Sequence, residues 1–186
     1  MKKFLLLAAA ILVSAMAFAK DYLYPTFGDI SVLKDKANTI FVQFDYTQAT
    51  VSGINFFEWQ KARGEEWVRD WPREEAEIRD YFTRYFNKKN KKGAALVSDP
   101  AIATHKMIIT PSMIDMGNTG GAFVPGFNPK SGGAVLWGTI EVLDNRTGQT
   151  VLVLKMDEIR GNSGYSETIR LKLAVYDLAG ELAGLK

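Results

Sequence analysis

The chain has 186 residues, with 23 Lys and Arg against 21 Asp and Glu and a formal net charge of +2 at pH 7. This balance gives no electrostatic reason to expect nucleic acid or an acidic membrane as the main partner. Because the chain contains no cysteine, it can form no disulfide framework, and packing alone must hold the fold together.

The first 19 residues, "MKKFLLLAAAILVSAMAFA", have the pattern of a secretory signal peptide. Two lysines precede an apolar run over residues 4–13, which is too short to span a membrane, and Ala17-Phe18-Ala19 forms an A-x-A cleavage site. We therefore expect cleavage after Ala19 and an exported chain, periplasmic or secreted, with one domain over residues 20–186. No cysteine follows the apolar run, so a lipid anchor on cysteine is excluded.

The first half of the mature chain predicts two strands and two helices. "GDISVLK" (28–34) is a candidate short edge strand, and "NTIFVQFDY" (38–46) alternates as a half-buried strand does. "INFFEWQKAR" (54–63) predicts a short helix that ends at Gly64. "DWPREEAEIRDYFTRYFNKKNKKG" (70–93) predicts a long amphipathic helix, with Asp70 as its cap and Pro72 in its first turn.

The second half predicts three strands and a final helix. The strands lie in residues 103–117, where Pro111 indicates an edge position or a bulge, in residues 133–144 and in residues 149–159. "DNRTG" joins the last two as a hairpin, and Ser166 caps an amphipathic helix to the end of the chain. The fold class that follows is α+β: a single two-layer sandwich with a mostly antiparallel sheet of four to five strands, packed by two long amphipathic helices and one short one.

The glycine-rich stretch 117–133, "GNTGGAFVPGFNPKSGG", raises the question of a phosphate site. Gly121 and Gly126 have the spacing of a Walker A loop, but Phe127 and Asn128 stand where that loop needs lysine and a hydroxyl. A phosphate loop also joins a strand to a helix, whereas strands are predicted on both sides here. We interpret the stretch as a long loop that binds a partner through Phe123, Val124 and Phe127.

The inventory of reactive side chains is sparse. His105 is the only histidine, and "GNSGY" (161–165) lacks the last glycine of a nucleophile elbow. No catalytic residues, metal site or cofactor are predicted. Paired carboxylates remain an alternative, because five acids lie on or near predicted strands: Asp45, Asp115, Glu141, Asp144 and Asp157.

Aromatic residues are dense between residues 56 and 86. Core packing of two helices explains most of them, and a ligand-stacking surface is the alternative. Trp59 and Trp67 fit the helical stripe least well, so we predict them as partner contacts. The "KKNKK" run (88–92) could bind an anionic envelope polymer, although complementarity to the helix dipole also explains it.

The signal peptide, the "IFVQFDY" strand, the aromatic helix, the "LDNRTG" hairpin and the C-terminal helix together resemble a family of small exported bacterial domains. Their fold is similar to the periplasmic α/β module of envelope assembly proteins, such as the N-terminal domain of TolB or the curli secretion lipoprotein. The lipid-anchored relatives begin with a cysteine that this chain lacks, and the resemblance implies no catalytic residues.

Three functions are therefore open. The first is an exported, non-catalytic binding or envelope-assembly accessory domain, whose partner is an unknown protein or envelope polymer. The second is a glycan- or peptide-directed hydrolase that uses two strand-borne carboxylates. The third is a structural, oligomer-forming envelope subunit, which would leave a large apolar face exposed on the monomer.

Overall fold

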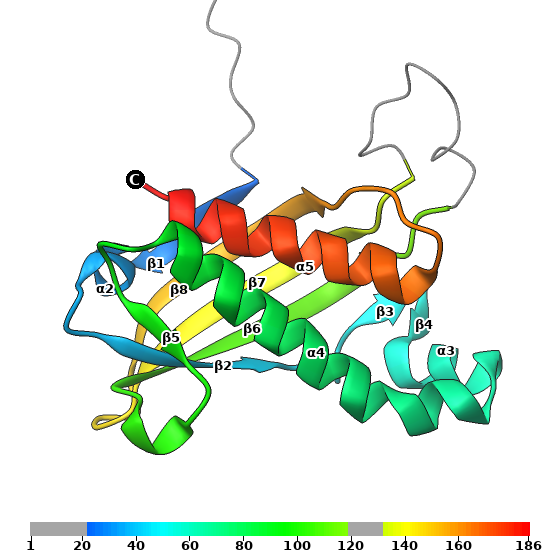
Figure 1. Ribbon diagram of the computed structural model, residues 1–186, viewed down its shortest axis with the longest axis horizontal. Helices are drawn as coiled ribbons and strands as arrows, with labels where there is room; N and C mark the ends of the chain where they lie inside the picture. Colours follow the sequence, from blue (N-terminus) through cyan, green and yellow to red (C-terminus); the bar gives the residue numbers. More distant parts are fainter. Residues whose placement is uncertain (1–21, 119–131) are drawn as a thin grey trace, which may run out of the picture.

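One β-sheet with helices against one of its faces forms the protein in the computed structural model, which describes residues 22–118 and 132–186 (Figure 1). The predicted signal peptide and Phe123, Val124 and Phe127 lie outside the described residues. The strands are β1 (Leu23–Gly28), β2 (Thr39–Phe44), β3 (Thr50–Val51), β4 (Ile54–Asn55), β5 (Ala95–Val97), β6 (His105–Asp115), β7 (Val135–Asp144) and β8 (Thr150–Arg160). The helices are α2 (Ser31–Lys34), α3 (Phe56–Arg63), α4 (Glu65–Lys89) and α5 (Glu167–Gly184), with a short 3₁₀ turn, η1 (Pro100–Ile102).

The sheet is mixed, and its order is β1-β8-β7-β6-β2-β5, with β3 beside β6 and β4 paired only with β3. The expected α+β class and two layers hold, but the prediction of a mostly antiparallel sheet of four to five strands is wrong. The described residues form an eight-stranded sheet in which β2 is parallel to both β5 and β6, and they add a fourth helix, α2.

Two physical reasons explain that error. The strands β3, β4 and β5 have only two or three residues, which is too short for an alternating pattern to show. The helices α3 and α4 lie between β2 and β5 in the chain, and such a crossover returns the chain to pair in parallel.

The N-terminal edge also differs from the expectation. The predicted edge strand 28–34 is wrong, because the strand is β1, which ends at Gly28, and Ser31–Lys34 is a short helix. Every residue of β1 except Leu23 is exposed, so no alternation marks it in the sequence. The carboxylate of Asp29 accepts a hydrogen bond from the Ser31 amide at 2.7 Å and turns the chain into α2.

Four of the strands, β2, β6, β7 and β8, follow the predicted pattern. In β2 and just beyond it, Ile40, Val42, Phe44 and Tyr46 are all buried, whereas the alternate residues are half-exposed. Of the two alternatives predicted at Pro111, an edge position or a bulge, the bulge is present, as a shift of the β6–β7 register between Pro111 and Met113. The predicted β7–β8 hairpin is also confirmed, with Gly148 at a φ of +69°.

Helix α4 starts earlier than its sequence indicates. It begins at Glu65 after Gly64, so Asp70 is not its cap and Pro72 lies inside the helix rather than in its first turn. The apolar stripe explains the longer helix, because Trp67 and Trp71 continue the helical spacing of Ile78, Phe82 and Phe86 back past the proline.

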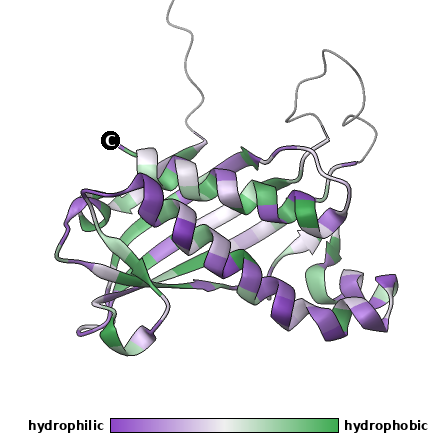
Figure 2. Cartoon of the chain, in the orientation of Figure 1, coloured by the Kyte–Doolittle hydropathy of each residue, from purple (hydrophilic) through white to green (hydrophobic). Residues whose placement is uncertain are grey.

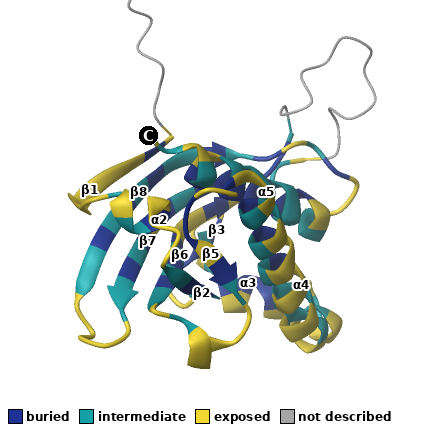
Figure 3. Cartoon of the chain, turned by 60° about the vertical axis from the view of Figure 1, so that its left-hand side comes forward, coloured by how far each residue is buried: buried dark blue, intermediate teal, exposed yellow. Residues whose placement is uncertain are grey.

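The core lies between the sheet and the paired helices α4 and α5, which run side by side across one sheet face (Figures 1 and 3). Ser166 caps α5 as predicted, accepting a hydrogen bond from the Ile169 amide at 3.2 Å. The stripe of α5 is buried through Leu171, Ala174, Val175, Leu178 and Leu182. Purple segments along α4 in Figure 2 mark its many hydrophilic residues.

Candidate binding site along the α4–α5 seam

The seam between α4 and α5 carries the most distinctive surface chemistry of the described residues. At its centre, the ammonium group of Lys172 on α5 donates to Glu74 of α4 at 2.8 Å and to Glu77 at 2.6 Å. The hydrogen bond from Lys172 lowers the pKa of Glu77 below its usual value. This ionic contact separates two hollows, one on each side along α4.

The first, which we call the tryptophan hollow, has a volume of about 180 Å³. It is lined by Glu66, Trp67, Asp70, Trp71, Glu74 and Thr168. Trp67 and Trp71 stand one helical turn apart, as do the three acids, so α4 presents two adjacent stripes of different chemistry to it.

The two tryptophans predicted as partner contacts, Trp59 and Trp67, differ from each other in how exposed they are. Trp67 is half-buried and lines the tryptophan hollow. Trp59 on α3 is only 8% exposed, with its ring edge-on to Trp67 at 5.3 Å between ring centres and the guanidinium of Arg63 at 5.2 Å above it. Trp59 is therefore a buried residue that packs against the ring of Trp67. Partner contact by either tryptophan stays a prediction.

The second, the tyrosine hollow, has a volume of about 280 Å³ and is lined by Tyr81, Arg84, Tyr85, Lys88 and Tyr176. The four residues from α4 follow the spacing i, i+3, i+4, i+7 and therefore share one helix face. Tyr176 comes from α5 and stacks on Tyr85 with 3.5 Å between ring centres and 24° between ring planes.

Cations surround these rings. The guanidinium of Arg84 lies 5.4 Å from the ring centre of Tyr81, and the ammonium of Lys89 lies 5.4 Å from that of Tyr85. A hydrogen bond with Tyr85, followed by burial, raises the pKa of Tyr176 above its ordinary value. The phenol of Tyr176 therefore stays neutral at physiological pH and adds no negative charge to the hollow.

A glycine on α5 makes room for this stack. A Cβ atom at Gly180 would lie 3.2 Å from a ring carbon of Tyr85. Glycine inside a helix costs about 1 kcal/mol relative to alanine, so its presence here fits the close approach of the tyrosine. Sequence reasoning identified the lysines of this end of α4 but missed Tyr176, because nothing in the sequence pairs α5 with α4 at this register.

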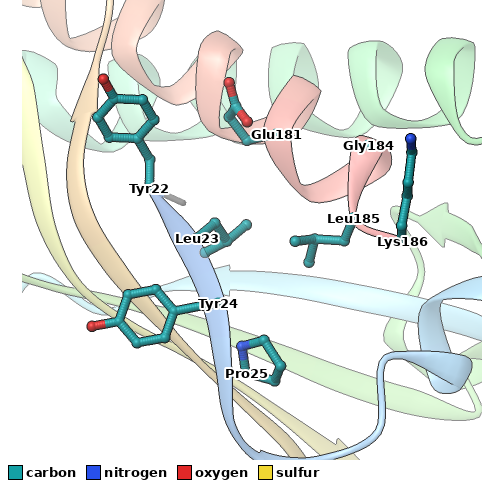
Figure 4. A pocket seen from close by; sticks show the side chains of 8 residues that line it. All are labelled: Tyr22, Leu23, Tyr24, Pro25, Glu181, Gly184, Leu185 and Lys186. Carbon is teal, nitrogen blue, oxygen red and sulfur yellow. The ribbon is translucent and has the colours of Figure 1, made fainter. Parts of the chain in front are cut away.

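A further pocket, of about 380 Å³, lies where β1 meets the C-terminal end of α5. Its lining residues are Tyr22, Leu23, Tyr24, Pro25, Glu181, Gly184, Leu185 and Lys186. In Figure 4, Leu23 and Leu185 point toward each other, whereas the rings of Tyr22 and Tyr24 lie on the far side of the strand. Its lining mixes the apolar side chains of Leu23 and Leu185 with the charged side chains of Glu181 and Lys186.

The five carboxylates of the hydrolase alternative lie on different parts of the sheet, and none of them lines the hollows described above. Asp144 is the last residue of β7, opposite the start of β6, and Asp115 is at the other end of β6, with its carboxylate accepting from the Gly117 amide. Asp45 follows β2, where a hydrogen bond from the Thr47 hydroxyl at 2.6 Å lowers its pKa. Glu141 accepts from the Thr150 hydroxyl, and Asp157 is on β8.

His105 lies at the start of β6, half-buried, with its Nδ1 2.8 Å from the Thr104 hydroxyl. Across residues 22–118 and 132–186, no three His, Asp or Glu side chains gather as a metal site would require. None of the helices within those ranges combines the length and the apolar character needed to cross a membrane.

Comparison with known proteins finds no matching family model and no matching curated protein. Among solved structures, the chain is similar to a PelC dodecamer from Paraburkholderia phytofirmans, with a TM-score of 0.46, 11% sequence identity and coverage of 88% of this chain and 98% of that chain. A dodecamer of a PelC variant from the same organism gives a TM-score of 0.40 and 9% identity, over 86% of this chain and 96% of that chain. Likenesses of this degree support no conclusion about function or assembly.

Proposed function

We propose that the chain is an exported, non-catalytic binding module of the bacterial envelope that holds an extended polymer along the α4–α5 seam. The observation that carries the proposal is the tyrosine hollow, where three aromatic rings and two cations from two helices converge on one surface depression. Export rests on the predicted signal peptide, and the accessory role rests on the resemblance to exported envelope domains.

The position of the seam favours binding over chemistry. Its walls are side chains of two packed helices, which are rigid elements suited to presenting fixed contacts. Glycoside hydrolysis needs two carboxyl groups about 5–10 Å apart on either side of the bond, and none of the five acids on the sheet lines the seam or the pocket beside β1.

The proposal is tested by native gel electrophoresis of residues 20–186 through gels that contain dextran (neutral), chitosan (cationic) or polygalacturonate (anionic). We expect at least one polymer to retard the protein and the Tyr81→Ala variant to be retarded less, with no release of reducing ends from any polymer. Tyr81 is 49% exposed, so its removal should not impair folding. Retardation by none of the polymers, or enzymatic release of reducing ends, would contradict the proposal.

A second candidate, the structural subunit, is favoured by the sheet face opposite the helices. Both α4 and α5 cover the same face (Figures 1 and 3), and the other face carries apolar side chains that stay partly exposed. They include Phe41, Ile108, Leu143 and Val153. A face of this kind marks an interaction surface when it is contiguous. Partner contact through Phe123, Val124 and Phe127 stays a prediction.

A further inference from the structure

We infer that the tyrosine hollow is selective for an anionic polysaccharide, a chain of uronate-type sugars whose carboxylates meet Arg84 and Lys88 while the sugar rings lie against Tyr81 and Tyr176. The inference rests on the proposed function, because it names the chemical class of the polymer that the seam would hold.

The cations of the hollow are available to an incoming carboxylate. Arg84 pairs with Asp80 at 2.8 Å, but the two side chains are 66% and 63% exposed, and exposed pairs of this kind contribute little. Among the ion pairs of the described residues, none engages Lys88 or Lys89. A ligand carboxylate can therefore bind here without displacing a strong internal contact.

The spacing of these groups suits a repeating polymer. Arg84 and Lys88 are one turn apart on the same face of α4, which corresponds to about 6 Å along the helix axis, the scale of a single sugar residue. Arg84 offers a planar fork of donors that matches a carboxylate, and Lys88 offers a mobile point charge. Lys91 and Lys92 extend the positive surface beyond the helix end.

The tyrosines supply aromatic surface, which a patch of lysines and arginines alone would lack. Their rings give rigid, flat apolar area with a hydroxyl at the edge, which suits a ligand that has apolar ring faces and polar rims. The neutral phenol of Tyr176 adds no negative charge beside Arg84 and Lys88.

The same geometry argues against a nucleic acid. Tyr85 and Tyr176 stack on each other with 3.5 Å between ring centres, which leaves fewer free ring faces than the row of successive aromatic platforms that single-stranded nucleic acids use. The acids of the tryptophan hollow bound the site at the other end, because Glu66, Asp70 and Glu74 would repel a polyanion that extended past Lys172.

The experiment is a calorimetric titration of residues 20–186 with polygalacturonate, dextran, chitosan and oligo(dT), carried out separately with each polymer. Each titration is measured at low and at high salt. We expect polygalacturonate to bind most tightly and to lose affinity at high salt, because the contacts are exposed charges. Arg84→Ser and Lys88→Ser should each weaken binding about tenfold, the equivalent of one charge-assisted hydrogen bond. Tyr81→Ala should weaken it as well.

Lys36→Ser is the matched control, because Lys36 is an exposed lysine in the turn after α2, and it should leave the affinity unchanged. Preferred binding of dextran or chitosan would overturn the inference while leaving the polymer-binding function intact. Equal affinity for oligo(dT) with the same variant sensitivity would also overturn it, as would a loss of affinity in Lys36→Ser equal to that of Lys88→Ser. Binding of no polymer at all would overturn the proposed function itself.

Discussion

The glycines at the two ends of the 117–133 stretch are required by the local backbone geometry, which the sequence alone does not reveal. Gly117 and Gly132 have φ angles of +63° and +82°, and the amide of Asn118 donates to the carbonyl of Gly132 at 3.0 Å. A Cβ atom at Gly133 would lie 1.9 Å from the carbonyl oxygen of Gly161. These positions require glycine for backbone geometry, which accounts for three of the glycines of the stretch without a ligand.

Gly161 lies close against the backbone of helix α5, and its substitution is a direct test of packing between the two. A Cβ atom there would lie 2.3 Å from the backbone nitrogen of Ala174 on α5, and backbone cannot move aside as a flexible side chain can. We expect Gly161→Ala to lower the free energy of unfolding by about 3 kcal/mol, measured by urea denaturation. Gly184→Ala, which meets no atom within 4 Å, is the control and should change little. Equal stability of the two variants would contradict this account.

Asp144 predicts a pH effect at the β7–β8 hairpin. Its carboxylate accepts hydrogen bonds from the amides of Thr147 at 2.9 Å and Arg146 at 2.8 Å, and these lower its pKa below the ordinary value of 3.8. The stabilisation is therefore present above the unfolded pKa and is lost as the pH falls through the lower folded pKa.

We expect Asp144→Asn to reduce the loss of stability between about pH 5 and about pH 2.5, compared by urea midpoints at the two values. The amide cannot ionise, so this part of the pH dependence disappears with the substitution. A variant whose midpoint falls as steeply as that of the wild type would show that the Asp144 carboxylate contributes nothing measurable.

Helix α4 shows where element-scale reasoning from sequence succeeds and fails. The gradient from acids to lysines and the aromatic stripe predicted a long amphipathic helix, and both are present. Its start was misplaced because Asp70-Trp71-Pro72 has the residue types of a helix N-terminus, whereas the packing of Trp67 carries the helix two turns further back. Tertiary packing overrode a local signal.

Pro72 within α4 gives a prediction at the same scale. A proline there removes one backbone hydrogen bond of the helix, and proline in a helix interior costs up to about 3 kcal/mol relative to alanine. We expect Pro72→Ala to raise the melting temperature, as followed by circular dichroism. Pro100→Ala at the first position of η1, where the missing N–H is harmless, should have little effect. A lower melting temperature in Pro72→Ala would mean that the proline supports the packing of Trp67 and Trp71.

At the scale of the whole molecule, the sequence predicted which residues form the long strands better than how the strands are arranged. Alternation identified β2, β6, β7 and β8 because each has one buried face. Parallel pairing of β2 with β5 and β6 left no such trace, since it depends on a crossover through α4. The tyrosine hollow was missed in part for the same reason: Tyr176 meets Tyr85 only after both helices pack on the sheet.

The second candidate function predicts self-association through the open sheet face. Ile108 lies at the centre of that face, between Gln43 of β2 and Glu141 of β7, and Ile108→Lys would place a charge in any interface formed there. A structural subunit should then shift from an oligomer to a monomer in light scattering after size exclusion. Ile102→Lys, on exposed η1, is the control and should not shift it. A wild-type protein that is monomeric at all concentrations would exclude this candidate.

Recognition along the α4–α5 seam is the claim on which the account depends most. It is tested most directly by amide chemical shifts of isotope-labelled residues 20–186 during titration with an oligogalacturonate. The account predicts saturable shifts confined to the second half of α4 and the part of α5 around Tyr176, with no change in the oligosaccharide itself. Shifts concentrated on the open sheet face, or cleavage of the oligosaccharide during the titration, would contradict it.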